Sequence, residues 1–393
     1  MEKYAWQLSA LARFLEVKSL LCDVNVGAGK TYFAISCIVE LLKTSSLDFS
    51  VLVVTPTIVL MKKNWYVELL KEGFSKEDIG MYYGVSKELK KITLTTVASF
   101  PKVSKLKRFN FLIYDEVHHC TSGVQLDSLF KNYEYILGLS STISCGSGMN
   151  LFLKRWFKEV YTFGSSEALS LSLMNRFTLK NIGIKILDVG LKYSYDCVSS
   201  EITKILERGG GFNKIMKGGF SRHKSEFLVK SNIRKGLVNG YMRKVLVCAN
   251  LICKNLDKQI IVFSETIKSV ESIKKELDFR GVSCGLCSSK TKVKDRDLIL
   301  DRYSSGELKV LLTARMFDEG YNLPKIDMAI IFSGNSKYSQ LKQRIGRATR
   351  KKEGNVVSKI YQLYLCDTYE ERYVKTRTKD FKRLCDSFEE IVV

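Results

Sequence analysis

Short apolar runs alternate with segments of helical periodicity in the first part of the chain. This pattern predicts strands at 19–26, 50–55, 91–97, 109–115 and 135–139. Helices are predicted between them, one through Leu42 and one to about Lys71. The apolar runs are continuous rather than alternating, which is typical of strands that are buried on both faces. We therefore expect a parallel sheet with helices as its connections.

The same pattern returns after about residue 258. It predicts further strands at 259–263, 308–313, 327–332 and 360–365. A helix to about Phe279 follows the first of these, and a charged helix is predicted from Tyr369 to Glu390. The fold class is therefore α/β, with parallel-sheet domains at 1–175 and 258–393. The segment between them, 176–257, is expected to be a basic connector or insertion that packs with the second domain.

The composition agrees with a folded chain of two to three domains. Of 393 residues, 45% are hydrophobic and 26% are charged, which excludes a disordered tail, a collagen-like chain and a small disulfide scaffold. Eleven scattered cysteines and an N-terminus without a signal peptide predict reduced thiols and an intracellular, cytoplasmic protein. Cys284 and Cys287 form one CxxC pair without a second ligand pair, so we expect two small apolar residues in or beside a strand.

Charge is the unusual property of the sequence. Sixty-three Lys and Arg residues against 41 acids give a net charge of +22, which favours a polyanionic partner. The stretch from Arg208 to Lys244 has ten basic residues and only one acid, Glu226. We expect an arm or helical insertion that grips DNA. A solvated charged connector remains the alternative, and compositional bias of the source organism could also explain the lysine excess.

The first chemical motif follows the first predicted strand and opens a helix. It reads Gly27-Ala28-Gly29-Lys30-Thr31, the context of a loop that binds phosphate through main-chain N–H groups. Lys30 would reach the β- and γ-phosphates and the Thr31 hydroxyl would bind Mg²⁺. Val24 stands where an earlier glycine is usual, so a flexible strand–helix turn is the alternative.

Two further clusters suggest phosphate chemistry. Asp115 and Glu116 end an apolar run, where their charge has to be solvated or paired. They suit an Asp that holds Mg²⁺ and a Glu that orients and deprotonates a water molecule. Arg347 and Arg350 are three residues apart on a predicted helix and can face a triphosphate together. A solvated strand end and a basic helix face are the respective alternatives.

Together, the motifs of this sequence resemble those of the superfamily 2 helicases and translocases of the DExH type. Nine sequence motifs in order carry the resemblance: Trp6-Gln7, Gly27–Thr31, Thr55–Thr57, Thr95-Thr96, Asp115–His118, Ser140–Thr142, Phe263-Ser264, Glu319–Pro324 and Gln343–Arg350. The stretches Val160–Phe163, Glu167–Leu169 and Phe177–Lys180 resemble the join between the domains of phage UvsW-like and XPB-like DNA helicases. The resemblance implies two tandem RecA-like domains that bind ATP and Mg²⁺.

The resemblance also implies a role for each matching residue. Catalytic residues would be Lys30, Asp115, Glu116, Gln343, Arg347 and Arg350. Nucleotide would contact Gln7, Gly27, Ala28, Gly29, Lys30, Thr31, Gly320 and Asn322, with Thr31 and Asp115 on Mg²⁺. His118, Ser140 and Thr142 would couple the nucleotide to the strand-binding face. Nucleic acid would contact Thr57, Thr95, Thr96, Ser264 and Thr313, and on the basic segment we add Lys214, Lys217, Arg222 and Lys224.

Three positions depart from the family pattern: Val24, Ser141 and Asn322. None of them removes a group that hydrolysis requires, so we expect an active ATPase. We predict an ATP-dependent DNA helicase or translocase that acts on branched or partly single-stranded DNA in repair, recombination or replication. The alternatives are a nucleic-acid-stimulated ATPase switch or motor subunit, and an RNA helicase. A monomer without membrane association is expected, and the lysine-rich, proline-poor chain suits a phage or other virus.

Overall fold

The computed structural model describes residues 4–120, 122–129, 133–143, 148–217, 222–316, 323, 326–350 and 356–393. Contacts divide the chain into two compact units. The first comprises Met1–Asn175, Phe317–Leu323 and Tyr338–Asn355, and the second comprises Arg176–Met316, Pro324–Lys337 and Val356–Val393.

The first unit is built on an eight-stranded sheet of order β4-β3-β5-β2-β6-β7-β1-β8. All neighbours in it are parallel except β3 and β4. Its elements are α1 (Ala5–Val17), β1 (Ser19–Val24), α2 (Lys30–Thr44), β2 (Val51–Thr55), α3 (Ile58–Leu60), the π-helical turn η1 (Met61–Trp65), α4 (Tyr66–Lys71), β3 (Ile79–Tyr83), β4 (Ser86–Lys87), β5 (Ile92–Thr96), α5 (Phe100–Leu106), β6 (Phe111–Asp115), the 3-10 helix η2 (Val117–His119), α6 (Gly123–Leu129), β7 (Tyr135–Ser140), α7 (Gly148–Trp156), β8 (Glu159–Phe163), α8 (Ser165–Ser170) and α15 (Tyr338–Ala348).

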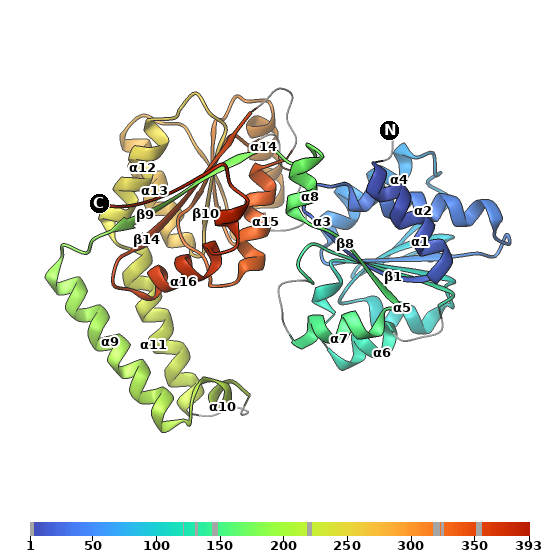
Figure 1. Cartoon of the computed structure of the whole chain (residues 1–393), viewed down its shortest axis with the longest axis horizontal. Helices are drawn as coiled ribbons and strands as arrows, with labels where there is room; N and C mark the ends of the chain where they lie inside the picture. The colour runs from blue at the N-terminus through green and yellow to red at the C-terminus, as the bar shows by residue number, and fades with distance from the viewer. Residues whose placement is uncertain are drawn as a thin grey trace. The chain divides into compact units, whose positions relative to one another are not determined.

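Helices cover both faces of this sheet, as the continuous apolar strands require. Figure 1 shows α1, α2 and α4 on one face and α5, α6 and α7 on the other. On the second face, Phe100, Leu129 and Leu153 pack against apolar side chains of the central strands. The register places the ends of β1, β7 and β6 together, since Asp23 pairs with Ser140 and Asp115 pairs with Leu139. The loops after these strands therefore lie at one edge of the sheet.

The second unit contains a seven-stranded sheet of order β11-β12-β10-β13-β14-β9-β15, with every neighbouring pair parallel. Its elements are β9 (Phe177–Ile184), α9 (Val189–Arg208), α10 (Phe212–Lys217), α11 (Arg222–Asn239), α12 (Met242–Cys253), β10 (Ile260–Ser264), α13 (Ile267–Phe279), β11 (Gly285–Cys287), α14 (Val293–Ser304), β12 (Val310–Ala314), β13 (Met328–Ile331), β14 (Ser358–Leu365), α16 (Tyr369–Thr378), the 3-10 helix η4 (Phe381–Arg383) and β15 (Ser387–Val392).

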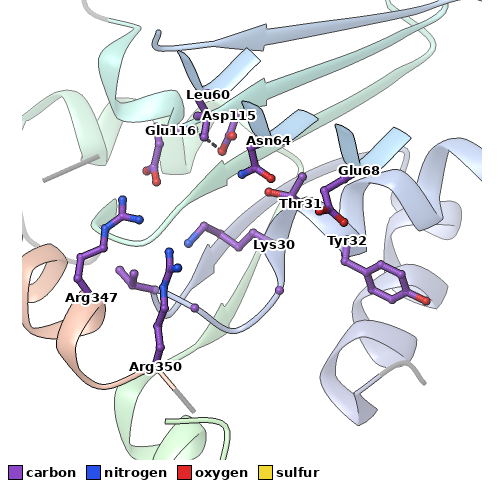
Figure 2. Close-up of a pocket in the computed structure, with 13 residues that line it drawn as sticks. Lys30, Thr31, Tyr32, Leu60, Asn64, Glu68, Asp115, Glu116, Arg347 and Arg350 are labelled. Carbon is purple, nitrogen blue, oxygen red and sulfur yellow. Dashed lines mark hydrogen bonds between the residues drawn. The ribbon is translucent and has the colours of Figure 1, made fainter. Parts of the chain in front are cut away.

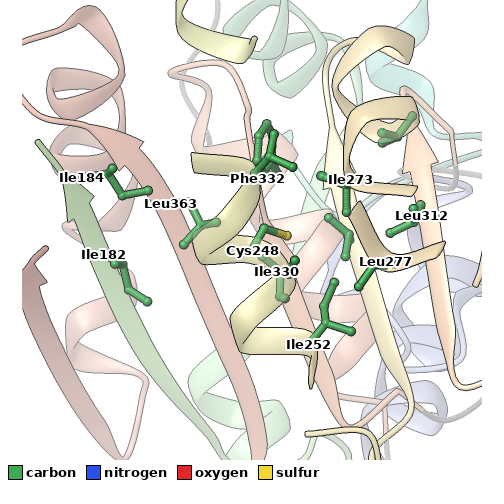
Figure 3. Close-up of a cluster of buried hydrophobic side chains, with 14 of the residues drawn as sticks. Ile182, Ile184, Cys248, Ile252, Ile273, Leu277, Leu312, Ile330, Phe332 and Leu363 are labelled. Atoms are coloured by element: carbon green, nitrogen blue, oxygen red, sulfur yellow. The ribbon is translucent and has the colours of Figure 1, made fainter. Parts of the chain in front are cut away.

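The core of the second unit lies between its sheet and two helices. Cys248 and Ile252 of α12 and Ile273 of α13 face strand residues such as Ile330 and Leu363 (Figure 3). All of these side chains are buried. Cys284 and Cys287 are also buried, with Cys287 at the end of β11, and burial raises the pKa of the Cys287 thiol to about 12. In the described ranges, no three His, Cys, Asp or Glu residues are placed to hold a metal ion.

The fold class is as expected, with a mainly parallel sheet in each unit, but three details differ from the sequence predictions. Helix α15 falls in the predicted second domain and belongs to the first unit. Strand β9 belongs to the second sheet, although its residues fall in the predicted connector. The predicted helix to Glu390 is wrong in its last part. Helix α16 ends at Thr378, and Ser387–Val392 forms the edge strand β15 beside β9. Main-chain pairing with a strand more than 200 residues earlier in the chain overrides the local helical pattern.

The basic segment forms an arm, which we define as α9, α10 and α11. Figure 1 shows α9 and α11 running side by side away from the sheet of the second unit, with α10 at their far end. Positive φ values at Gly210 and Gly211 turn the chain between α9 and α10. Lys230 of α11 pairs with Glu201 of α9 at 2.6 Å.

The root of the arm is fixed to the segment that begins α16. The main-chain N–H of Tyr369 donates to the Tyr195 hydroxyl at 2.7 Å. Lys244 in α12, directly after the arm, is fully buried, and its Nζ lies 2.7 Å from both carboxylate oxygens of Glu370. Arg234 lies over the Tyr369 ring at 5.1 Å. These contacts give the arm a defined attachment to its own unit.

Candidate active site

The glycine-rich loop joins β1 to α2 in the first unit. Gly27 and Gly29 have φ values of 82° and 86°, which a residue with a side chain rarely adopts. Lys30 is the first residue of α2, and its Nζ donates to the Val24 carbonyl at 3.2 Å. The loop therefore ends on a helix N-terminus, where free N–H groups and the helix dipole favour an anion.

Two residues of α1 support this loop. Trp6 donates from Nε1 to the Ala28 carbonyl at 3.2 Å, and Gln7 donates from Nε2 to the Gly29 carbonyl at 3.1 Å. The side-chain Oε1 of Gln7 accepts from the Tyr4 N–H at 2.9 Å, and the Gln7 side chain is buried. In this geometry Gln7 supports the loop through the Gly29 carbonyl, and its predicted contact with the nucleotide stays a prediction.

The acid pair lies at the end of β6. Asp115 accepts hydrogen bonds from Trp65 Nε1 at 2.8 Å and from the Glu116 N–H at 3.0 Å. Burial, aided by the neighbouring Glu116 charge, raises the pKa of Asp115 to about 6. Glu116 has a φ of 49°, a backbone conformation that costs a non-glycine residue about 1–3 kcal/mol. Strained backbone of this kind is typical of functional sites.

His118 connects the acid pair to the segment after β7. Its Nδ1 lies 2.9 Å from Ser140 Oγ, 3.4 Å from Thr142 Oγ1 and 3.4 Å from a carboxylate oxygen of Glu116. The Thr142 N–H donates to Ser140 Oγ at 3.2 Å. The three residues predicted to couple nucleotide and strand binding therefore form one hydrogen-bonded group beside Glu116.

Helix α15 and the residues just after it bring two arginines to the same place. Arg347 and Arg350 extend toward Glu116 and Lys30 in Figure 2. Burial and the adjacent Arg347 charge lower the pKa of Arg350 to about 10, and its Nη1 donates to the Leu323 carbonyl at 3.1 Å. A Cβ on Gly346 would lie 2.6 Å from the Val26 Cβ, so only glycine permits this approach of α15 to the loop.

These groups surround a cavity of about 420 Å³ within the first unit, a size typical of small-molecule sites. Its lining includes residues that the sequence motifs did not single out. Tyr32 follows Thr31 on α2. Leu60, Asn64 and Glu68 recur at intervals of four along the helical segment after β2. That spacing is a signal that could have found them. The lining residues are Val26, Gly27, Gly29, Lys30, Thr31, Tyr32, Leu60, Asn64, Glu68, Asp115, Glu116, Arg347 and Arg350.

Other predicted site residues lie elsewhere. Gln343 is buried on α15 and Ala28 is buried in the loop, and neither lines the cavity. Gly320 and Asn322 lie outside the described residues. Trp65 was missed because an apolar residue in a helical segment gives no chemical signal, although it holds the Asp115 carboxylate.

The hydroxyl residues predicted to contact nucleic acid divide into two groups. Thr95, Ser264 and Thr313 are fully buried. Thr95 donates to the Tyr82 carbonyl at 2.7 Å and Thr313 to the Met316 carbonyl at 3.0 Å, while Ser264 bonds to neighbouring serines. Direct contact of these three with a sugar-phosphate chain does not agree with their burial.

The remaining two hydroxyls lie nearer the surface. Thr57 is exposed and accepts from the Leu60 N–H as the N-cap of α3. Thr96 is largely buried at the end of β5.

The predicted nucleic-acid contacts of the basic segment lie at the far end of the arm. Lys214 is exposed on α10. Arg222 is exposed at the start of α11 and pairs with Glu226 at 2.8 Å. Lys224 donates to the Met216 carbonyl at 3.3 Å. Lys217 ends α10, and its side chain is outside the described residues.

Comparison with known proteins agrees with this geometry. Residues 1–145 match the family described as type III restriction enzyme, res subunit, and residues 243–352 match the helicase conserved C-terminal domain. The DNA 3'-5' translocase XPB2 of Sulfurisphaera tokodaii is 26% identical over 88% of this chain and 78% of its own length. The DNA 3'-5' helicase XPB of Kineococcus radiotolerans is 21% identical over 95% of this chain, which spans 62% of that relative.

A solved structure, the Hef helicase domain of Pyrococcus furiosus, has the same fold. The TM-score is 0.61 at 13% identity, covering 95% of this chain and 98% of that one. The chain is a superfamily 2 helicase with two RecA-like domains, an enzyme class that hydrolyses ATP. Within that superfamily it is XPB-like. Among the described residues, no helix has the length and hydrophobicity needed to cross a membrane.

Proposed function

We propose that this protein is an ATP-dependent DNA helicase or translocase that acts on branched or partly single-stranded DNA in repair, recombination or replication. One observation supports it above the others. Lys30, an acid pair and two arginines, which come from separate elements, converge on one cavity. The names of the relatives, which are DNA translocases and helicases, favour DNA as the substrate.

The cavity supplies the groups that phosphoryl transfer requires. The glycine loop and Lys30 bind the phosphates of ATP. Glu116 accepts the proton of the attacking water. The strained backbone at Glu116 carries its side chain, which lines the cavity. Arg347 and Arg350 stabilise the charge that develops on the transferred phosphate. Catalysis in this proposal depends mainly on positioning and electrostatics.

The residues also fit a magnesium ion. Two hydrogen bonds, from Trp65 and the Glu116 N–H, orient the Asp115 carboxylate without using all its acceptor capacity. Asp115 and the Thr31 hydroxyl would hold the ion beside the phosphates, and Mg²⁺ prefers such oxygen ligands. When bound, the ion would neutralise phosphate charge.

The group formed by His118, Ser140 and Thr142 would connect hydrolysis to strand binding. His118 is within 3.4 Å of the Glu116 carboxylate and of both hydroxyls. A change in the charge near Glu116 therefore reaches the segment after β7 through direct contacts. The basic arm would grip the duplex or junction, because its charges are exposed on helices and can meet phosphates.

Steady-state ATP hydrolysis tests the proposal. Rates are measured without nucleic acid and then with single-stranded DNA, forked DNA, duplex DNA and RNA, beside Glu116→Gln. The proposal requires strong stimulation by forked DNA that is lost in the variant. Stimulation by RNA alone would replace the DNA assignment with an RNA helicase, and no hydrolysis under any condition would contradict the motor.

A strand-displacement assay separates the motor from the second candidate, a nucleic-acid-stimulated switch or a motor subunit of a larger assembly. The exposed charge of the arm suits binding as well as it suits unwinding, so hydrolysis alone does not decide between them. Displacement on forks or Holliday junctions supports the helicase. Stimulated hydrolysis without displacement supports the switch. Since one chain supplies all the described groups of the cavity, we propose that a monomer is active.

A further inference from the structure

Helix α7 has an aromatic surface that no part of the proposed mechanism uses. Its inner side chain, Leu153, and Phe157 just after it are buried in the core of the first unit. Its outer face has Phe152 and Trp156, which are 41% and 44% exposed. Their rings stack on each other with centroids 6.4 Å apart and an interplanar angle of 17°. Adjoining exposed apolar side chains mark candidate interaction sites.

The charge around this pair limits what the partner can be. Arg155, which precedes Trp156 in the helix, is exposed, and Lys154 and Lys158 are exposed near it in the sequence. The sequence has no acid between Glu134 and Glu159. Exposed rings beside basic side chains are the arrangement that binds single-stranded nucleic acid, because each base offers a flat face and each linkage a phosphate.

The position of α7 gives such binding a consequence. Helix α7 contacts η2, the short helix that contains His118 and His119. The Phe157 ring packs so closely over β7 that a Cβ on Gly138 would lie 2.6 Å from it. Strand β7 ends at Ser140, whose hydroxyl bonds to His118. Bases bound at α7 would therefore lie on a helix that contacts η2. The helix η2 contains His118, which bonds to Ser140 beside Glu116.

We infer that Phe152 and Trp156 form a stacking platform for unpaired bases of the nucleic acid, with Arg155 contacting an adjoining phosphate. The inference rests on the proposed function and adds to it a binding site for the single-stranded part of the substrate. It gives the first unit a contact to bases, which is separate from the phosphate contacts of the arm.

Tryptophan fluorescence reports directly on the platform. The chain has three tryptophans, and Trp6 and Trp65 are buried whereas Trp156 is exposed. Oligothymidylate should quench the emission of the wild type. An abasic oligonucleotide of the same length should leave the emission nearly unchanged, because it has phosphates and no bases. Trp156→Phe should bind oligothymidylate and lose the quenching.

Affinity measurements complete the test. Phe152→Ala with Trp156→Ala should weaken oligothymidylate binding by roughly tenfold or more, since stacking is worth about that much per base. Binding of the abasic chain should hardly change. The matched control is Leu151→Ala, which removes a 60% exposed apolar side chain from the same helix and should leave both affinities unchanged.

Two results would overturn the platform. One is equal binding of both oligonucleotides to the wild type and the double variant, with no quenching. The other is self-association of the wild type that the double variant loses while its oligonucleotide affinity stays the same, which would assign the surface to a second copy of the chain. Failure of the proposed function has a different signature, because the wild type would then hydrolyse ATP at one rate with or without any nucleic acid.

Discussion

The cavity of the first unit and the arm of the second unit use charge in opposite ways. In the cavity, Asp115 is buried and each carboxylate oxygen accepts a hydrogen bond. On the arm, the Arg222 side chain is 89% exposed and its partner, Glu226, is on the same helix. Charges in a low-dielectric site interact strongly and only in one geometry, whereas exposed charges contribute weakly and additively.

This contrast determines where single substitutions should matter. A change in the cavity alters one fixed arrangement, so one residue can abolish the chemistry. A change on the arm removes one of many similar contacts, so several residues have to be neutralised together. The root of the arm is an exception, because Lys244 and Glu370 form a pair buried as deeply as any group in the cavity.

The largest effect should come from Glu116→Gln. The variant keeps the size of the side chain and loses the base, so hydrolysis should fall by about 10²–10⁴-fold. ATP binding, measured with a fluorescent analogue, should remain. Glu68→Gln is the control, since Glu68 lines the same cavity without a predicted role in the chemistry. Equal losses in the two variants would contradict the assignment of Glu116 as the base.

The next largest effect, on the free energy of unfolding, should come from removing the buried cation at the root of the arm. Lys244→Met leaves the Glu370 carboxylate buried without its partner, at a cost of about 3–5 kcal/mol in the free energy of unfolding. Urea unfolding followed by circular dichroism measures it. Adding Glu370→Leu should recover part of the loss, because an apolar pair can replace a buried ion pair. The recovery is incomplete because the Leu365 N–H loses the Glu370 carboxylate as its acceptor. A double variant as unstable as the single one would contradict this explanation.

Gly346→Ala should reduce hydrolysis by about 10–100-fold while the protein stays folded. The new Cβ would meet the Val26 Cβ at 2.6 Å and push α15 and its arginines from the loop, an overpacking cost of about 1–3 kcal/mol. Gly236→Ala on the exposed helix α11 is the control, because a Cβ at Gly236 would have no neighbouring atom within 4 Å. Activity of Gly346→Ala equal to that of the control would show that the arginines do not depend on this close contact.

Neutralising the far end of the arm should have the smallest effect for each residue changed. Changing Lys214, Lys217, Arg222 and Lys224 together to alanine should weaken DNA binding by roughly tenfold at moderate salt and reduce its salt dependence. Fluorescence anisotropy at several salt concentrations measures both. The matched control removes four exposed lysines from the body of the same unit: Lys254, Lys275, Lys292 and Lys294. An arm variant that binds like the wild type would identify the arm as a solvated connector.

The same contrast explains what could be predicted from sequence. The glycine loop, the acid pair and the arginines are short contiguous patterns whose chemistry is local, and the structure places Lys30, Glu116 and Arg350 around one cavity. Trp65 was not predicted because its role is one hydrogen bond to Asp115, which is 50 residues away in the sequence.

Features that depend on distant pairing were the ones predicted poorly. Strand β15 exists through its pairing with β9 and has no strong pattern of its own. Buried threonines on strands were interpreted as surface groups, because sequence does not reveal that Thr95 already bonds to the Tyr82 carbonyl.

In the proposed mechanism the cavity performs the chemistry and the arm binds the DNA, and one titration tests this division of roles. ATP hydrolysis is measured against increasing forked DNA for the wild type and the variant with the four arm changes. The DNA concentration for half-maximal stimulation should rise roughly tenfold in the variant, and the maximal rate should stay the same. A lower maximal rate at an unchanged half-maximal DNA concentration would contradict the claim.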